Sequence, residues 1–268
     1  MHFRDGLDTC CPGIQTIQRI YGGNLDAAVL HGIAIDLIEK AFHLKTKRAQ
    51  FASVGQIIDP ITKEVLQTQS ISEVIELDSD FFGHLVGIAE VDIAGYYDIQ
   101  NGTIFLDNKK WCMDTLMHET LHSRSAFSKK PCYPNFDFVI EGITELLVGL
   151  VFKRTLLDCY LVWQTIDNCF HNSYDEFVQP WHYLTYKINF DQIIELYFNQ
   201  RINDPIQELG RILGKSCDKA FEKLFSNYSP TEATFREKFI DLMGKLYGSE
   251  FAEFMSTNLK ETITLESL

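Results

Sequence analysis

The feature that most constrains this chain is the stretch of residues 118–122, which reads H-E-T-L-H and so has the pattern H-E-x-x-H. On a helix, residues four apart lie on one face with Cβ atoms roughly 5–6 Å apart, so His118 and His122 can reach one point. Glu119 lies about 100° further around the helix. It cannot easily share that point, but it can reach a small molecule bound there.

Two imidazoles at this spacing are typical ligands of zinc, which binds a histidine nitrogen at about 2.0–2.1 Å. A catalytic zinc has three protein ligands and an open position that holds water. The ion lowers the pKa of that water to about 7, and Glu119 is then placed to act as a general base. We therefore expect one Zn²⁺ ion per chain, with His118 and His122 as ligands and Glu119 as the catalytic residue.

A third ligand must come from elsewhere, and Glu141 is the best candidate. Eighteen residues separate it from His122, and it lies in the apolar segment 139–152. An ionised carboxylate in such a segment is costly unless it is paired or bound to a metal. Glu145 shares its helical face, and we expect it to accept the ring N–H of a ligand histidine. Gly142 allows the close approach of another helix or of a substrate, or it is simply a packing contact.

An H-E-x-x-H motif followed after eighteen residues by Glu in an E-G-x-x-E context resembles the gluzincin zinc metallopeptidases, such as aminopeptidase N-like and thermolysin-like enzymes. The resemblance covers only about residues 100–155. It implies three zinc ligands: His118, His122 and Glu141. It also implies Glu119 as general base, and it places Glu145 where thermolysin-like members have an Asp. The chain lacks the G-x-M-E-N segment with which the aminopeptidase branch holds a free amine, which favours an endopeptidase.

Three functions fit these residues. Two of them are enzymes, a zinc metallopeptidase and a zinc hydrolase of a non-peptide amide, and the sequence does not distinguish between these two. The remaining function is that of a non-catalytic interaction protein whose zinc holds two helices together. Glu119 argues against this interaction protein, because a structural zinc needs no base and is usually four-coordinate. Hydrolysis also needs a donor to the oxyanion, and the candidates remain open. They are His171, Tyr174, His182, Tyr183 and Tyr186.

Composition narrows the class of protein. The chain has 268 residues, of which 46% are hydrophobic and 23% charged, which is typical of a globular protein with a sizeable core. Its net charge of −13 repels phosphate, so we expect no nucleic-acid binding. No apolar run is long enough to span a membrane, and no signal-peptide core is present. Seven cysteines without a C-x-x-C pair indicate free thiols. We expect a cytoplasmic protein, or one exported without a cleavable signal peptide, that acts on a peptide or protein substrate.

The pattern of elements predicts an α+β, zincin-like fold that forms one compact catalytic unit. Residues 1–128 are expected to form an N-terminal lobe with a small sheet and the H-E-x-x-H helix. Residues 129–268 are expected to form a mostly helical lobe that carries Glu141. A first helix is predicted from Asn24. In the second lobe, helices are predicted over residues 174–187, 190–201, 205–213, 218–225, 231–246 and 249–259.

Residues 50–100 are predicted to form short strands and turns, with apolar strand candidates at 74–77 and 86–89. The Asn101-Gly102 pair predicts a β-hairpin between strands at 96–99 and 104–106. The resemblance implies that the second of these strands is the cleft edge, which pairs with an extended substrate; the alternative is an ordinary meander strand. Asn108 is predicted to cap the H-E-x-x-H helix. The apolar stripe of that helix is predicted to be core, and it consists of Met113, Met117 and Leu121.

Overall fold

The structure is a computed structural model that describes residues 27–44, 50–53, 56–58, 73–86, 93–129, 137–156, 175–199, 201–226 and 234–258. These residues are mostly helical with a small sheet, which confirms the α+β class. They divide into two compact units. The first holds the described residues of 1–123 and 151–169, and the second those of 124–150 and 170–268. The predicted lobes and the zincin-like topology stay predictions.

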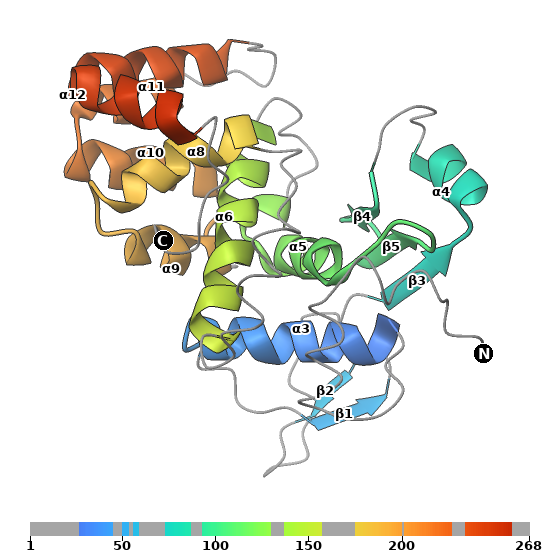
Figure 1. The fold of residues 1–268 in the computed structure, drawn as a ribbon. Helices are drawn as coiled ribbons and strands as arrows, with labels where there is room; N and C mark the ends of the chain where they lie inside the picture. Colours follow the sequence, from blue (N-terminus) through green and yellow to red (C-terminus); the bar gives the residue numbers. More distant parts are fainter. Residues whose placement is uncertain are drawn as a thin grey trace. The chain divides into compact units, whose positions relative to one another are not determined.

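A three-stranded mixed sheet lies in the first unit, with the strand order β3-β5-β4 (Figure 1). Strands β4 (Gly95–Asp98) and β5 (Thr103–Asp107) form the predicted antiparallel hairpin. Gly102 in its turn has a φ of 67°, which glycine adopts without steric cost. Strand β3 (Glu73–Leu77) pairs with β5 in parallel.

The strand order corrects the expectation that residues 104–106 form a cleft edge. Strand β5 is paired on both sides, because β3, which comes from far upstream in the sequence, occupies its second edge. Within the described residues, β4 is the hairpin strand that is paired on one side only. A substrate that adds to this sheet next to the hairpin would therefore pair with β4.

Helices and a second, two-stranded sheet complete the first unit. Strands β1 (Gln50–Ser53) and β2 (Gln56–Ile58) pair antiparallel. Helix α3 spans Ala27–Ala41 and buries one apolar face, which includes Leu30, Ile33, Leu37 and Ile38, whereas Ala28 and Val29 are exposed. The predicted helix start at Asn24 lies outside the described residues.

Helix α4 (Ser79–Val86) stands where only strands and turns were predicted, and it contains Val86. The strand candidate at 86–89 is therefore wrong at Val86, while residues 87–89 lie outside the described part. The backbone N–H of Phe82 donates to the carbonyl of Asp78 at 2.8 Å, and the Ser79 hydroxyl donates to Asp107 at 2.6 Å. The sequence D-S-D before an apolar run is a helix N-terminus signal, and here it outweighs the β-propensity of the apolar residues.

Helix α5 (Met113–Arg124) carries the H-E-x-x-H motif. It begins at Met113, so the prediction that Asn108 caps it is wrong. The backbone N–H of Asn108 instead donates to the carbonyl of Leu77 at 2.9 Å, which ties the end of β5 to the end of β3. The predicted apolar stripe is confirmed as core, since Met113, Met117 and Leu121 are all buried.

The second unit is helical, and the predicted helices are confirmed to within a few residues at their described ends. Gly248 has a φ of 57° and breaks α12, in agreement with the two helices predicted before and after it. The elements are η1 (Phe127–Lys129), most of α6 (Asp137–Leu156), α8 (Asp175–Thr185), α9 (Asp191–Phe198), α10 (Pro205–Ser216), α11 (Lys219–Ser226) and α12 (Phe235–Asn258).

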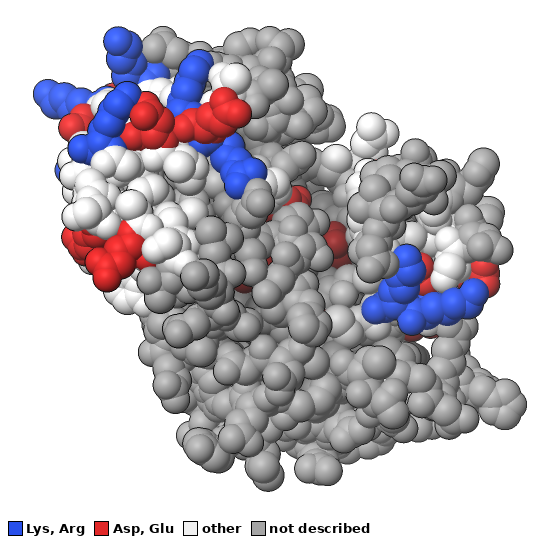
Figure 2. All heavy atoms as spheres, turned by 45° about the horizontal axis from the view of Figure 1, so that its top comes forward, with Lys and Arg blue, Asp and Glu red and all other residues white. Residues whose placement is uncertain are grey.

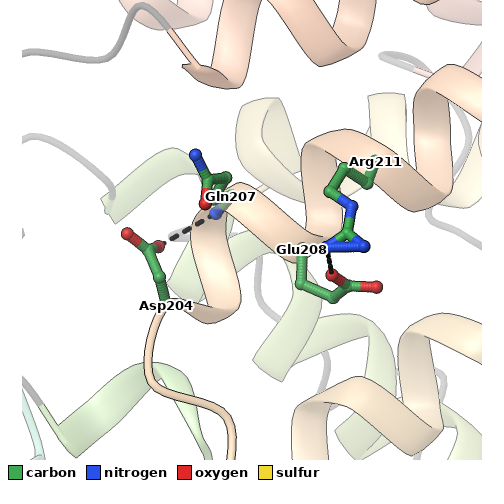
Figure 3. A network of polar contacts seen from close by, with 4 residues as sticks. All are labelled: Asp204, Gln207, Glu208 and Arg211. Carbon is green, nitrogen blue, oxygen red and sulfur yellow. Dashed lines mark hydrogen bonds and ion pairs between the residues drawn. The ribbon is translucent and has the colours of Figure 1, made fainter.

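Helix α10 shows how local sequence fixes a helix start in this unit (Figure 3). The Asp204 carboxylate accepts a hydrogen bond from the backbone N–H of Gln207 at 3.0 Å, and Pro205 occupies the first turn. This satisfies one of the N–H groups that a helix leaves unpaired at its start. One turn further, Arg211 donates to Glu208 at 2.7 Å.

The described C-terminal helices of the second unit carry charged side chains of both signs. Basic and acidic side chains are interspersed over its C-terminal helices on the face drawn in Figure 2. Ion pairs on helices α10 and α12 include Arg211 with Glu208 and Lys245 with Asp241. Among the described residues, no helix is both long enough and apolar enough to cross a membrane.

Candidate metal centre

Helix α5 brings the two predicted histidine ligands together. The Nε2 atoms of His118 and His122 are 2.9 Å apart, and their ring centroids are separated by 4.6 Å. Both side chains are buried, with only 7% and 8% of their surface exposed. Two nitrogens bound to one tetrahedral zinc at 2.0–2.1 Å lie about 3.3 Å apart, so the observed separation is close to that of a ligand pair.

Glu141, on α6, is the third member of this group. One ligand atom from each of His118, His122 and Glu141 can be chosen so that all three lie within 4.8 Å of one another. Two imidazoles and a carboxylate are a donor set that zinc takes in catalytic sites. The residues present therefore fit a metal ion, and zinc as that ion stays a prediction.

Glu119 is also buried, with 8% of its surface exposed. Strand β4 passes close to it. A Cβ atom built on Gly95 would lie 2.9 Å from Cγ and 3.1 Å from Oε1 of Glu119, and 2.7 Å from Cγ2 of Thr115. Burial, the charge of Asp98 and the charge of Glu119 together raise the pKa of Tyr96, the residue after Gly95. The side chain of Glu119 thus lies against β4, one of the two end strands of the sheet within the described residues.

Sequence reasoning did not single out Gly95. An isolated glycine inside a strand pattern is a recognised signal for the close approach of another backbone or side chain. At Gly95 the approaching group is Glu119, the predicted catalytic residue. The sequence signal for this contact was the isolated glycine in the strand before the hairpin turn.

Gly142 lies where helices α6 and α8 pack closely against each other. A Cβ atom there would meet Cδ1 of Trp181 at 2.6 Å and the backbone oxygen of Phe177 at 2.7 Å. Both belong to α8, so of the readings left open for Gly142 the structure supports the approach of another helix. The indole N–H of Trp181 donates to the carbonyl of Phe138 at 3.1 Å, which fixes α8 against the turn of α6 that precedes Glu141.

A buried hydroxyl pair fixes α6 on the other side of Glu141. The hydroxyls of Thr144 and Tyr197 are 2.8 Å apart, and both side chains are fully buried. Tyr197 belongs to α9, and its carbonyl also accepts the backbone N–H of Ala126 at 2.7 Å. Because buried polar groups are costly unless paired, this bond favours one arrangement of α6 and α9.

The remaining predicted residues are placed as follows. Glu145 is half-buried on α6, one turn after Glu141, and its predicted bond to a ligand histidine stays a prediction. Among the oxyanion candidates, His171 and Tyr174 lie outside the described residues. His182 and Tyr183 are buried, and both pack against Phe254.

The third described candidate, Tyr186, is 55% exposed. Its hydroxyl lies 3.1 Å from Nε2 of His182, one helical turn away. None of these observations selects a donor for the oxyanion.

Comparison of the chain with protein-family models, with curated proteins and with solved structures gave no match.

Proposed function

We propose that the chain is a zinc-dependent metallopeptidase that hydrolyses internal peptide bonds rather than removing terminal residues. The observation that carries the proposal is the convergence of two buried imidazole nitrogens, 2.9 Å apart, in a group with the Glu141 carboxylate. A buried glutamate directly follows the first histidine, and a structural zinc site has no use for it.

In this proposal each residue has one task. His118, His122 and Glu141 hold the ion through ring nitrogens and a carboxylate oxygen. Bound zinc supplies Lewis acidity and a water of lowered pKa. Glu119 accepts the proton of the attacking water on its carboxylate and then donates it to the leaving amine.

The preference for peptides rests on the sheet. Strand β4 lies against Glu119 at Gly95, and within the described residues it has a partner strand on one side only. The backbone N–H and C=O groups along an end strand can pair with an extended peptide, whose own N–H and C=O groups are the same along any sequence. A small non-peptide amide has no repeated backbone N–H and C=O groups with which to pair along such a strand.

The experiment compares the metal content and the peptidase activity of four proteins purified without chelator. They are the parent, Glu141→Ala, Glu119→Gln and, as a control at an exposed glutamate on α12, Glu253→Ala. We expect about one zinc per chain in the parent and in the Glu253 and Glu119 variants, and a large loss in Glu141→Ala. Cleavage of an unstructured peptide library should disappear in Glu119→Gln and on addition of chelator.

Each alternative gives a different result. An interaction protein with a structural zinc binds the metal and cleaves no peptide, and Glu119→Gln changes nothing. A hydrolase of another amide leaves the library intact but turns over small amide substrates in a chelator-sensitive reaction. A parent that binds no metal after incubation with zinc rules out the metal centre altogether.

A further inference from the structure

Strand β4 and helix α5 approach each other so closely at Gly95 that a side chain there would require its neighbours to shift. A Cβ atom on Gly95 would lie 2.7 Å from Thr115 Cγ2 and 2.9 Å from Glu119 Cγ, whereas ordinary van der Waals contact begins at 3.4 Å. Gly95 itself is buried, and its φ is not in the left-handed region. The requirement for glycine here is therefore one of space and not of backbone conformation.

We propose that Gly95 is a positioning residue for Glu119: the strand backbone at Gly95 forms the wall against which the Glu119 side chain rests. The inference depends on the proposed function for its importance in catalysis, but the contact itself does not. Thr115, one turn earlier on α5, lies against the same point of the strand. Because Thr is β-branched, its χ1 angle has few alternatives and it cannot readily move aside.

The side chain that can move is Glu119. To restore normal contact, an alanine at position 95 would need about 0.7 Å more room at Thr115 Cγ2 and about 0.5 Å more at Glu119 Cγ. Because Thr115 is stiff, part of this room must come from a shift of the β4 or α5 backbone, and rotation about χ1 and χ2 of Glu119 carries its carboxylate further. A misplacement of about 1 Å in a catalytic group can cost about 10²-fold in rate. Gly95→Ala should therefore lower kcat by about 10- to 100-fold while zinc content and KM change little.

The decisive test does not need activity. Burial is the largest cause that raises the pKa of Tyr96, followed by the charge of Asp98 and then the charge of Glu119. Comparison of the parent with Glu119→Gln first measures how far Tyr96 responds to Glu119. We would titrate Tyr96 in the metal-free protein by NMR of ¹³C-labelled tyrosine, with the resonance assigned from Tyr96→Phe. The proteins are the parent, Gly95→Ala, Glu119→Gln and the double variant, which form a double-mutant cycle. Gly32→Ala is the matched control, since a Cβ at Gly32 has no atom within 4 Å.

Gly95→Ala should change the Tyr96 pKa when residue 119 is Glu and leave it nearly unchanged when residue 119 is the uncharged Gln. Gly32→Ala should leave it unchanged in both backgrounds. The same change in both backgrounds would show that alanine acts on Tyr96 directly, and no change in either would show that Glu119 does not move. Either result overturns the inference even in an active enzyme, while an inactive parent with the predicted coupling overturns only the proposed peptidase.

Discussion

Replacing Gly142 by alanine should destabilise the packing of helix α8 on helix α6, next to Glu141. The added Cβ would lie 2.6 Å from Cδ1 and 2.9 Å from Nε1 of Trp181, and 2.7 Å from the backbone oxygen of Phe177. Trp181 is fully buried, and Phe177 presents backbone rather than a flexible side chain. Neither group can swing aside, so the two helices must separate locally.

The size of the effect follows from three terms. Forcing a methyl group into a packed core costs about 1–3 kcal/mol. Displacing Trp181 weakens its hydrogen bond to the Phe138 carbonyl, and a buried N–H left unpaired costs about 1–3 kcal/mol. The higher helix propensity of alanine offsets about 1 kcal/mol. We therefore expect Gly142→Ala to lower the free energy of unfolding by about 1–5 kcal/mol.

Urea unfolding followed by tryptophan fluorescence measures this change, with Gly244→Ala as the control on α12 of the same unit. A Cβ at Gly244 meets no atom within 4 Å, so that variant should be as stable as the parent or more stable by up to about 1 kcal/mol. Equal midpoints for Gly142→Ala and Gly244→Ala would refute the close-contact argument. If the contact is real, zinc affinity should also fall in Gly142→Ala, because the neighbouring Glu141 moves with the α6 backbone.

Two further predictions concern stability. Asp204→Ala removes the side-chain bond to the Gln207 N–H and should cost about 1 kcal/mol in urea unfolding, whereas Arg211→Ala, which breaks only a solvent-exposed pair, should cost less than about 0.5 kcal/mol. Burial, followed by the Cys217 thiol, raises the pKa of Tyr247, so the unfolded chain releases this proton first, from about pH 10. The contribution of Tyr247 to the free energy of unfolding should be fully present below about pH 10 and be lost as the pH rises above it. The free energy of unfolding, measured against pH, should fall less steeply in Tyr247→Phe, and an unchanged slope would contradict the assignment.

The parts of the fold that the sequence predicted are those decided by residues close together in the chain. The helical spacing of His118 and His122 fixes their common face, and Gly102 sets the hairpin turn because few other residues adopt its φ. The break at Gly248 was predicted on the same local grounds. Each of these depends on neighbours within about one or two turns, so no knowledge of tertiary contacts was needed.

The errors arose where a distant partner decides the outcome. Strand β5 was taken for an edge because nothing in the hairpin reveals that β3 pairs with it from upstream. Asn108 was assigned to a helix cap, but its backbone N–H bonds to Leu77 at the end of that same β3 strand. Parallel pairing joins residues about thirty apart in this chain, and hydrophobic periodicity carries no information about such a partner.

The two glycines beside the candidate site also have roles that are decided by distant partners and not by local sequence, and here these contacts affect the candidate metal centre. Gly95 and Gly142 are adjacent to a crowded side chain or backbone, whereas Gly32 and Gly244 have open space, yet the four are indistinguishable as letters in the sequence. At Gly95 the crowding group is Glu119 itself, and at Gly142 it is the helix that packs beside Glu141. If both close contacts are needed, alanine at either position should impair the centre by different routes: loss of turnover with zinc retained at Gly95, and loss of stability and zinc affinity together at Gly142.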